Sequence, residues 1–61
     1  MLNWICDDGV YCSDDKRFTI MRATENYHSG QRWMRDNKTD MEEFRDTLRD
    51  CKYVAETYWN K

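Results

Sequence analysis

The sequence contains no proline, only two glycines, and no apolar run of about 18 residues or more. Without proline, no position has a locked φ or lacks a backbone donor, which favours short continuous elements. A helix that crosses a membrane needs about 20 mostly apolar residues, so we expect no membrane association. Asp7 and Asp8 interrupt the first apolar stretch, which argues against a secretory signal peptide. We therefore expect a protein of the cytoplasm.

Purely hydrocarbon core side chains are also scarce, since Leu, Ile, Val and Phe together provide eight of the 61 residues. Such a low content raises the question of disorder. Three Trp and four Tyr offset it, because each buries roughly 150–250 Å² when packed, and the net charge is only −2. We expect one domain over residues 1–61, with a small aromatic core and slim stability.

Metal-ligating residues are few and widely spaced. Cys6, Cys12, His28 and Cys51 are the residue types of a Cys₃His zinc site, but no tight Cys-x2-4-Cys knuckle is present. We expect separate structural cysteines that stay reduced, with Cys51 behaving as a small hydrophobe. A zinc site and a Cys6–Cys12 redox pair are the alternatives, and we predict no cofactor.

A cysteine paired with His28 is the one enzymatic arrangement that we consider. Such a site needs a base, an orienting group and an oxyanion site inside a pocket. A chain of 61 residues with two glycines offers little material for a pocket. His28, next to Ser29 and Gly30, is typical of a loop. We therefore predict that the protein is not an enzyme.

The C-terminal stretch, residues 40–59, has the spacing of an amphipathic helix. Its apolar residues recur every three or four positions and fall on one stripe: Met41, Phe44, Leu48, Cys51, Ala55 and Tyr58. This stripe predicts a helix that packs on the elements upstream.

Two starts of this helix compete. In the first, Asp40 is the N-cap, Glu43 completes a capping box, and the helix runs from residue 41. In the second, residues 41–44 form a short strand, and Thr47 is the N-cap with Asp50 in the Glu position. Both predict a helix from residue 48 to about residue 59.

Two strands are predicted upstream. In residues 17–23, the alternation puts Phe18 and Ile20 on the face that meets the helix, together with Arg22. Residues 31–35 form the second strand, with Trp33 facing inward. An antiparallel hairpin of the two would carry several Arg residues on its outer face.

Turn signals separate these strands. Asp7-Asp8-Gly9 predicts a turn between short strands at residues 3–6 and 10–12. Residues 13–16 give a second turn, and residues 24–30 a loop. The predicted fold class is α+β: a short antiparallel meander of two to four strands packed on one C-terminal α-helix.

Charge is distributed in bands along the chain. Residues 1–15 carry four acids and no base, Asp7, Asp8, Asp14 and Asp15, whereas residues 16–35 have a net charge of +4. Gly9 comes too early for an EF-hand loop. The acids therefore indicate a solvated loop or an imitation of nucleic-acid phosphates that blocks a basic groove.

Within the basic band, Arg22, Arg32 and Arg35 are candidate partner-binding residues. Arginine beside Trp33 and Tyr27 is a pattern of single-strand binders, although a pI near 5.2 argues against a dedicated nucleic-acid binder. Internal pairing and a protein partner are the other interpretations.

The helix ends with more aromatic surface than one stripe buries. Tyr53 lies well off the stripe, so we expect Tyr53 or Trp59 to be exposed for a partner. A homodimer through this end is a further prediction. In the alternative, the region of Trp4 and Val10 folds over it.

Three segments together resemble small phage- and prophage-encoded proteins with a β-meander and one C-terminal helix: RFTI at residues 17–20, RWMRD at 32–36 and FRDTLRDCKYVAE at 44–56. Thr47 and Leu48 match the helix start of that class, and Cys51 stands where Ala is usual. Phe44 sits one residue upstream of its position in the class pattern. The resemblance implies a host-takeover or anti-defence factor, including anti-CRISPR proteins, and it carries over no functional residue.

These observations predict a small non-enzymatic binding protein. It would be a phage-encoded inhibitor in the bacterial host cytoplasm, and it would occlude the surface of a host or defence protein or nucleoprotein complex. The alternative is a nucleic-acid-binding module that uses an Arg-rich sheet face. The candidate partner-binding residues are Arg22, Arg32, Arg35, Asp7, Asp8, Asp14, Asp15, Tyr53 and Trp59.

Overall fold

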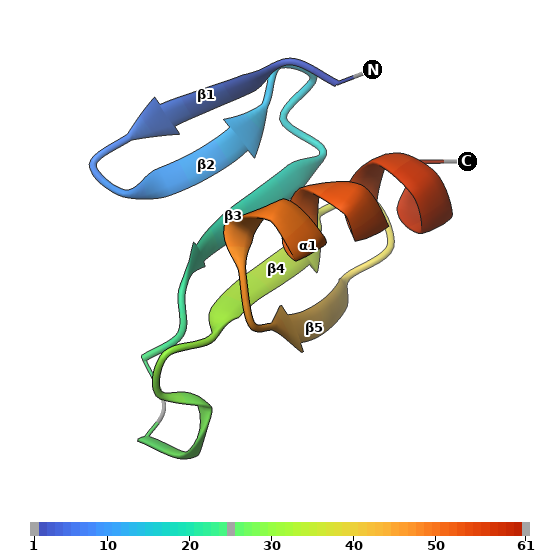
Figure 1. Cartoon of the computed structure of the whole chain (residues 1–61). Coiled ribbons are helices and arrows are strands. Elements are labelled where there is room, and N and C mark those ends of the chain that lie inside the picture. The colour runs from blue at the N-terminus through green and yellow to red at the C-terminus, as the bar shows by residue number, and fades with distance from the viewer. Residues whose placement is uncertain (1, 25, 61) are drawn as a thin grey trace.

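The protein forms one antiparallel sheet with a helix across one of its faces (Figure 1). A computed structural model describes residues 2–24 and 26–60, so Glu25 of the predicted loop lies outside the described residues. The strands follow one another in chain order: β1 (Trp4–Asp7), β2 (Val10–Ser13), β3 (Phe18–Arg22), β4 (Arg32–Asp36) and β5 (Met41–Arg45). Helix α1 (Leu48–Val54) continues as a π-helical turn (Ala55–Trp59), and a 3₁₀ turn (Asn26–His28) lies between β3 and β4.

The predicted α+β class is confirmed, but the sheet has five strands where two to four were expected. The strand beyond these four is β5. The predicted N-terminal hairpin is present, and in it Asp7 pairs with Val10 across a two-residue turn. Asp8 and Gly9 both have positive φ, 54° and 80°. Positive φ at both central positions is the geometry of a type I′ turn, whose twist matches that of the flanking strands.

The second of the two predicted helix starts is correct. Residues 41–45 pair along the whole of β4, which satisfies backbone groups that a helix would have satisfied internally. Thr47 is the N-cap, and its side chain accepts a 3.1 Å hydrogen bond from the Asp50 amide. Asp40 has a φ of 63°, whereas an N-cap residue is extended.

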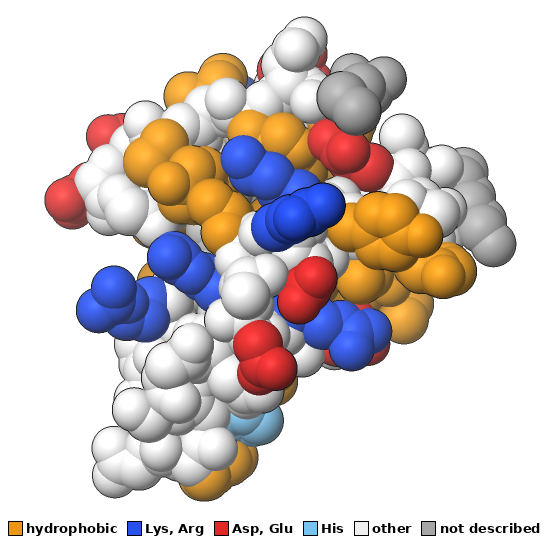
Figure 2. All heavy atoms as spheres, viewed as in Figure 1, with side chains coloured by type: hydrophobic (Ala, Val, Ile, Leu, Met, Phe, Trp, Pro, Cys, Tyr) orange, Lys and Arg blue, Asp and Glu red, His pale blue; other side chains and the backbone are white. Residues whose placement is uncertain are grey.

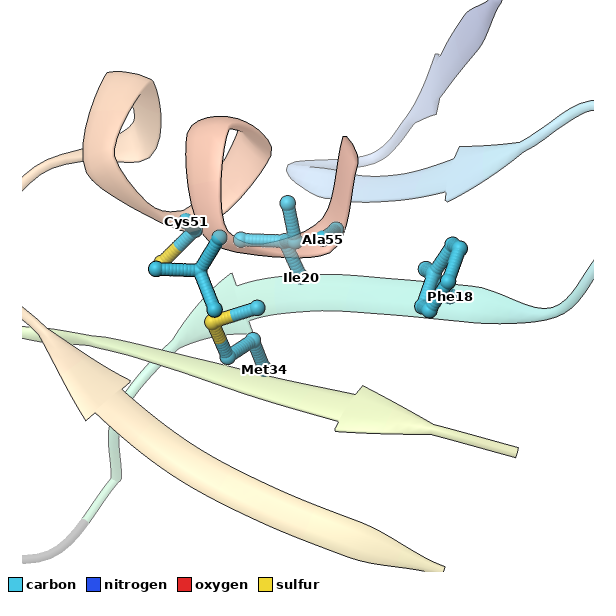
Figure 3. Packing of buried hydrophobic residues seen from close by; sticks show 6 residues of the cluster. Phe18, Ile20, Met34, Cys51 and Ala55 are labelled. Carbon is cyan, nitrogen blue, oxygen red and sulfur yellow. The ribbon is translucent and has the colours of Figure 1, made fainter. Parts of the chain in front are cut away.

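The core lies between the helix and the middle of the sheet. Phe18, Ile20 and Met34 from the strands meet Cys51 and Ala55 from the helix (Figure 3). All five are at most 1% exposed. The predicted placement of Phe18 and Ile20 toward the helix is therefore confirmed.

The predicted inward orientation of Trp33 is wrong. Ile20 pairs with Met34 across β3 and β4, so Met34 shares the helix side with Ile20. Because successive strand residues point to opposite faces, Trp33 lies on the other face. The same register puts Arg32 on the helix side with Arg22, so the predicted row of arginines on the outer face is also wrong.

A buried ion pair between Arg17 and Asp36 links the sheet to the end of the helix. Asp36 is 2% exposed and accepts hydrogen bonds from Arg17 Nε at 3.1 Å and Arg17 Nη2 at 2.9 Å. Arg17 Nη2 also donates to the Trp59 carbonyl oxygen at 2.7 Å. Burial opposes ionisation of Asp36, but hydrogen bonds from Arg17 and the Lys38 amide outweigh it and lower its pKa.

Candidate binding surfaces

The sheet face that no described helix covers, called the open face below, is more apolar than a solvent-facing sheet surface usually is. The strand register assigns its side chains. They are Ile5, Asp7, Val10, Cys12, Thr19, Met21, Trp33, Arg35, Glu42 and Phe44, of which six are apolar. An alternation of apolar and polar residues would have made this face polar, so its composition points to a binding surface.

The aromatic end of the open face is built from three neighbouring strands. Trp33 of β4 pairs with Met21 on one side and with Phe44 on the other. The His28 ring stacks on Phe44 with centroids 3.6 Å apart and an interplanar angle of 2°. A hollow of about 220 Å³ opens here, lined in part by Met21, Trp33 and Phe44. Methionine and aromatic residues of this kind are enriched in protein interfaces.

Arg35 lies on the open face but is occupied by neighbouring acids. Its guanidinium forms ion pairs with Asp40 and Glu42 and donates a hydrogen bond to Asn37. Glu42 in turn accepts a 2.8 Å hydrogen bond from Trp33 Nε1. The structure therefore does not bring Arg35 together with Arg22 and Arg32.

The four N-terminal acids do not form one cluster. Asp7 and Asp8 lie at the tip of the β1–β2 hairpin, and Asp14 and Asp15 follow the far end of β2. Four strand residues separate these ends by roughly 13 Å. Asp15 accepts hydrogen bonds from the Ser13 hydroxyl at 2.6 Å and from the Arg17 amide, and these lower its pKa. Asp15 therefore stabilises the turn.

On the helix side, arginines stand in register across three strands. Arg22 pairs with Arg32, and Arg32 pairs with Arg45. Arg45 Nη2 lies 2.9 Å from Glu43 Oε2, at an angle that makes no hydrogen bond. Within residues 2–24 and 26–60, Arg22 and Arg32 have no ion pair. Figure 2, viewed onto the helix, shows Lys and Arg side chains gathered on this side of the molecule.

The three cysteines lie apart. Cys6 is exposed on the helix side of β1, and Cys12 belongs to the open face. Cys51 is a residue of α1 that is buried against the sheet. Cys6 and Cys12 therefore point to opposite faces of the hairpin, which separates the suggested redox pair. Burial raises the pKa of Cys51 to about 11. Among the described residues, no group of three or more His, Cys, Asp or Glu is arranged to hold a metal ion.

The aromatic residues of the helix divide between core and solvent. Tyr53 is 58% exposed, as predicted, and packs edge-on against Tyr58. Trp59 turns inward and lies 6.4 Å from Phe18 between ring centroids. Trp4 also covers this end, because its Nε1 donates to Glu56 Oε2 at 2.9 Å. Of the two predicted binding residues here, only Tyr53 is exposed to a partner.

No protein-family model, curated protein or solved structure matches this chain. Within residues 2–24 and 26–60, no helix has the length and apolar content to cross a membrane.

Proposed function

We propose that this chain is a small non-enzymatic binding protein that occludes the surface of a partner protein with its open face. The observation that carries this proposal is the row of Met21, Trp33 and Phe44, which lie side by side on the face without a helix. Flat aromatic and methionine-rich surfaces supply contact area at the centre of protein interfaces. Occlusion needs no turnover, which suits a chain of 61 residues.

The charge around the open face suggests the chemistry of the partner. Asp7 and Asp14 flank the hollow that contains Ile5 and Val10, and Lys16 is the base among the described residues lining it. Asp40 and Glu42 both pair with Arg35 and together exceed its charge by one, and Arg22 adds one base at the aromatic hollow. The rim is therefore net acidic, and it complements a partner whose apolar contact site has a basic border.

The class of partner follows from the sequence resemblance. Small phage- and prophage-encoded proteins with this arrangement of strands and helix are often directed against bacterial host or defence factors. We propose a partner of that kind, met in the host cytoplasm, as an anti-CRISPR or similar inhibitor would meet it. A basic groove that normally holds nucleic acid on such a factor would fit the acidic rim.

The test compares two surface substitutions of the same kind on opposite sides of the molecule. Met21→Asp places a charge in the open face, and Tyr53→Asp places one on the exposed side of the helix. Tagged wild-type protein and both variants are incubated with nuclease-treated bacterial lysate, and retained proteins are identified by mass spectrometry. Circular dichroism confirms that both variants fold.

The proposal expects one protein that is retained by the wild type and by Tyr53→Asp and lost with Met21→Asp. That protein, once purified, should bind the wild type at a 1:1 ratio. Equal loss with both variants, or no retained protein, would contradict the assignment of the open face. Loss of the retained protein with Tyr53→Asp alone would assign the interface to the exposed side of the helix.

The alternative, a nucleic-acid-binding module with an Arg-rich sheet face, has less support. It depended on Arg22, Arg32 and Arg35 sharing one face, but Arg35 lies on the opposite side and is paired with acids. The same incubation is repeated with untreated lysate. Retention of many proteins there that is lost after nuclease treatment would favour this alternative.

A further inference from the structure

Three arginines that lie directly opposite one another on neighbouring strands are unusual. Residues directly opposite in an antiparallel pair have Cβ atoms about 5 Å apart, and like charges at that spacing are destabilising. Arg22, Arg32 and Arg45 nevertheless occupy such positions on β3, β4 and β5. Arg22 and Arg45 are exposed and Arg32 is only half-buried, so the row adds little to the core, and the repulsion indicates a role other than stability.

Only one member of the row has an ion partner in the described part of the chain. Arg45 lies beside Glu43, whereas Arg22 and Arg32 have none. Asp46 is the one acid among the described residues that line the adjoining cleft, and it accepts a 2.9 Å hydrogen bond from Gln31 Nε2. Asp8 lines a second hollow beside the same two arginines but forms no ion pair with them. Both guanidinium groups therefore lack an ion-pair partner among the described residues.

This cleft has the volume of a typical ligand-binding site. It measures about 650 Å³ and lies between the ends of β3 and β4, the loop after β3, and the start of α1. Ligand sites in proteins are typically about 300–1,000 Å³. Thr24, Asn26 and Ser29 also line the cleft and offer hydroxyl and amide donors.

We propose that this cleft binds a phosphate group of a nucleotide, held between the guanidinium groups of Arg22 and Arg32. Each guanidinium presents a planar fork of N–H donors that matches two phosphate oxygens. A phosphate monoester has three non-bridging oxygens and a phosphodiester has two, each with more than one lone pair, so either can accept from both guanidinium groups at once. The bound anion also removes the repulsion between the arginines.

The nucleotide, as distinct from a bare phosphate, follows from a second observation. Arg22 and Thr24 line the cleft and also line the aromatic hollow beside Trp33 and Phe44. The cleft and the hollow therefore adjoin at the end of β3, although they open on opposite faces of the sheet, and a base attached to the phosphate would pass around the end of β3 to reach the aromatic surface. A cationic groove next to aromatic side chains is the arrangement with which proteins hold single-stranded nucleic acid. The same phosphate chemistry belongs to a free nucleotide.

The experiment measures binding of a fluorescein-labelled thymidine strand of about 12 nucleotides by fluorescence anisotropy, between about 50 and 200 mM salt. Arg22→Gln and Arg32→Gln each remove one guanidinium group, with its charge and its paired N–H donors. Arg49→Gln is the matched control, because this exposed helix residue carries the same charge on the same side and does not line the cleft. Competition with thymidine monophosphate separates a free nucleotide from a strand as the source of the phosphate.

Each cleft variant should weaken binding about ten-fold or more, because it leaves a charge-assisted hydrogen-bond pair unmade. Arg49→Gln should change it less than about two-fold. The single phosphate held between the two arginines predicts a salt slope near −0.7 on a single strand, and weakening of that contact in a cleft variant should make the slope shallower.

Two results would overturn the proposal: no binding of strand or monophosphate by the folded wild type, or an equal loss with Arg49→Gln, which would indicate diffuse attraction. Displacement of the strand by an equivalent concentration of monophosphate would assign the site to free nucleotides, and resistance to it would assign a strand. These variants leave Met21 in place, so a failure here does not affect the test of the open face.

Discussion

Replacement of Asp36 by Asn should remove one of the strongest constraints in this fold. In the wild type, both carboxylate oxygens accept from Arg17, and Oδ1 also accepts from the Lys38 amide at 2.9 Å. Asparagine keeps one oxygen, but it places an amide N–H group against the guanidinium. Arg17 then retains its charge at a site where its principal counter-ion has been removed.

The expected loss of stability is large for so small a chain. Breaking a buried ion pair by removing one partner costs about 3–5 kcal/mol. Arg17 still donates to the Trp59 carbonyl and its side chain is 15% exposed, so we expect about 3 kcal/mol, the lower end of that range. Domains of this size have a free energy of unfolding of roughly 3–9 kcal/mol. Asp36→Asn should therefore be close to unfolding at room temperature.

The pH dependence gives an independent readout of the same carboxylate. In the folded chain the pKa of Asp36 lies below its ordinary value of 3.8. The unfolded chain therefore takes up the proton first as the pH falls. The stabilisation is complete above about pH 4 to 5 and is lost as the pH falls through the lower, folded pKa. Asp36→Asn should have a shallower dependence in this range, with the part due to Asp15 remaining.

Urea unfolding at pH 7 and at pH 3, followed by circular dichroism, measures both effects. Asp40→Asn is the control, because Asp40 is a 76% exposed partner of Arg35, and exposed ion pairs contribute little to stability. A loss below about 1 kcal/mol for Asp36→Asn, or an unchanged slope of stability between pH 5 and pH 3, would refute the argument.

Three further predictions concern the core, the helix start and the thiols. Ile20→Ala should lower the free energy of unfolding by about 2–5 kcal/mol in urea titrations, since Ile20 is fully buried and leaves a cavity. Thr47→Ala should cost about 1 kcal/mol in the same assay by removing the N-cap, and Thr47→Ser should restore it. At pH 8, an alkylating reagent followed by mass spectrometry should modify exposed Cys6 rapidly and Cys51 only on unfolding, because burial raises the pKa of Cys51 to about 11.

The parts of the fold that were predictable are those in which local pattern and tertiary packing agree. Phe18 and Ile20 alternate with polar residues, and Thr47 has a cap partner three positions later. The extent of the helix was ambiguous because Met41, Phe44 and Leu48 fall by coincidence on helical spacing. The pairing of residues 41–45 with β4 decides it, and that hairpin contact with the preceding strand cannot be read from the helical spacing within residues 41–48.

The end of the helix shows a different limit. Continuing the stripe from Ala55 by three residues predicts Tyr58 on the core side. The final turn is π-helical and has more residues per turn. It advances the inward position by one residue, so that Trp59 packs on Phe18 and Tyr58 is 58% exposed.

The candidate surfaces were harder to predict than the core, because both depend on the register of β4. Trp33 and Met34 are adjacent, and only one of them can face the helix. Because Ile20 pairs with Met34, Met34 faces the helix. The same register places Arg32 on the helix side and Arg35 on the open face. A one-residue slip would bury Trp33 and remove both surfaces at once.

The same register explains how so small a chain presents two chemistries. Its core uses one face of the sheet and one side of a short helix, which leaves the other face of every strand available. At the end of β3, Arg22 adjoins both the aromatic hollow and the basic cleft. A partner protein that normally carries nucleic acid would bring apolar contacts and phosphates to neighbouring positions. The two proposals therefore meet at the end of β3, and tests of Met21 and Arg22 in the same partner complex would show whether the two contacts are coupled.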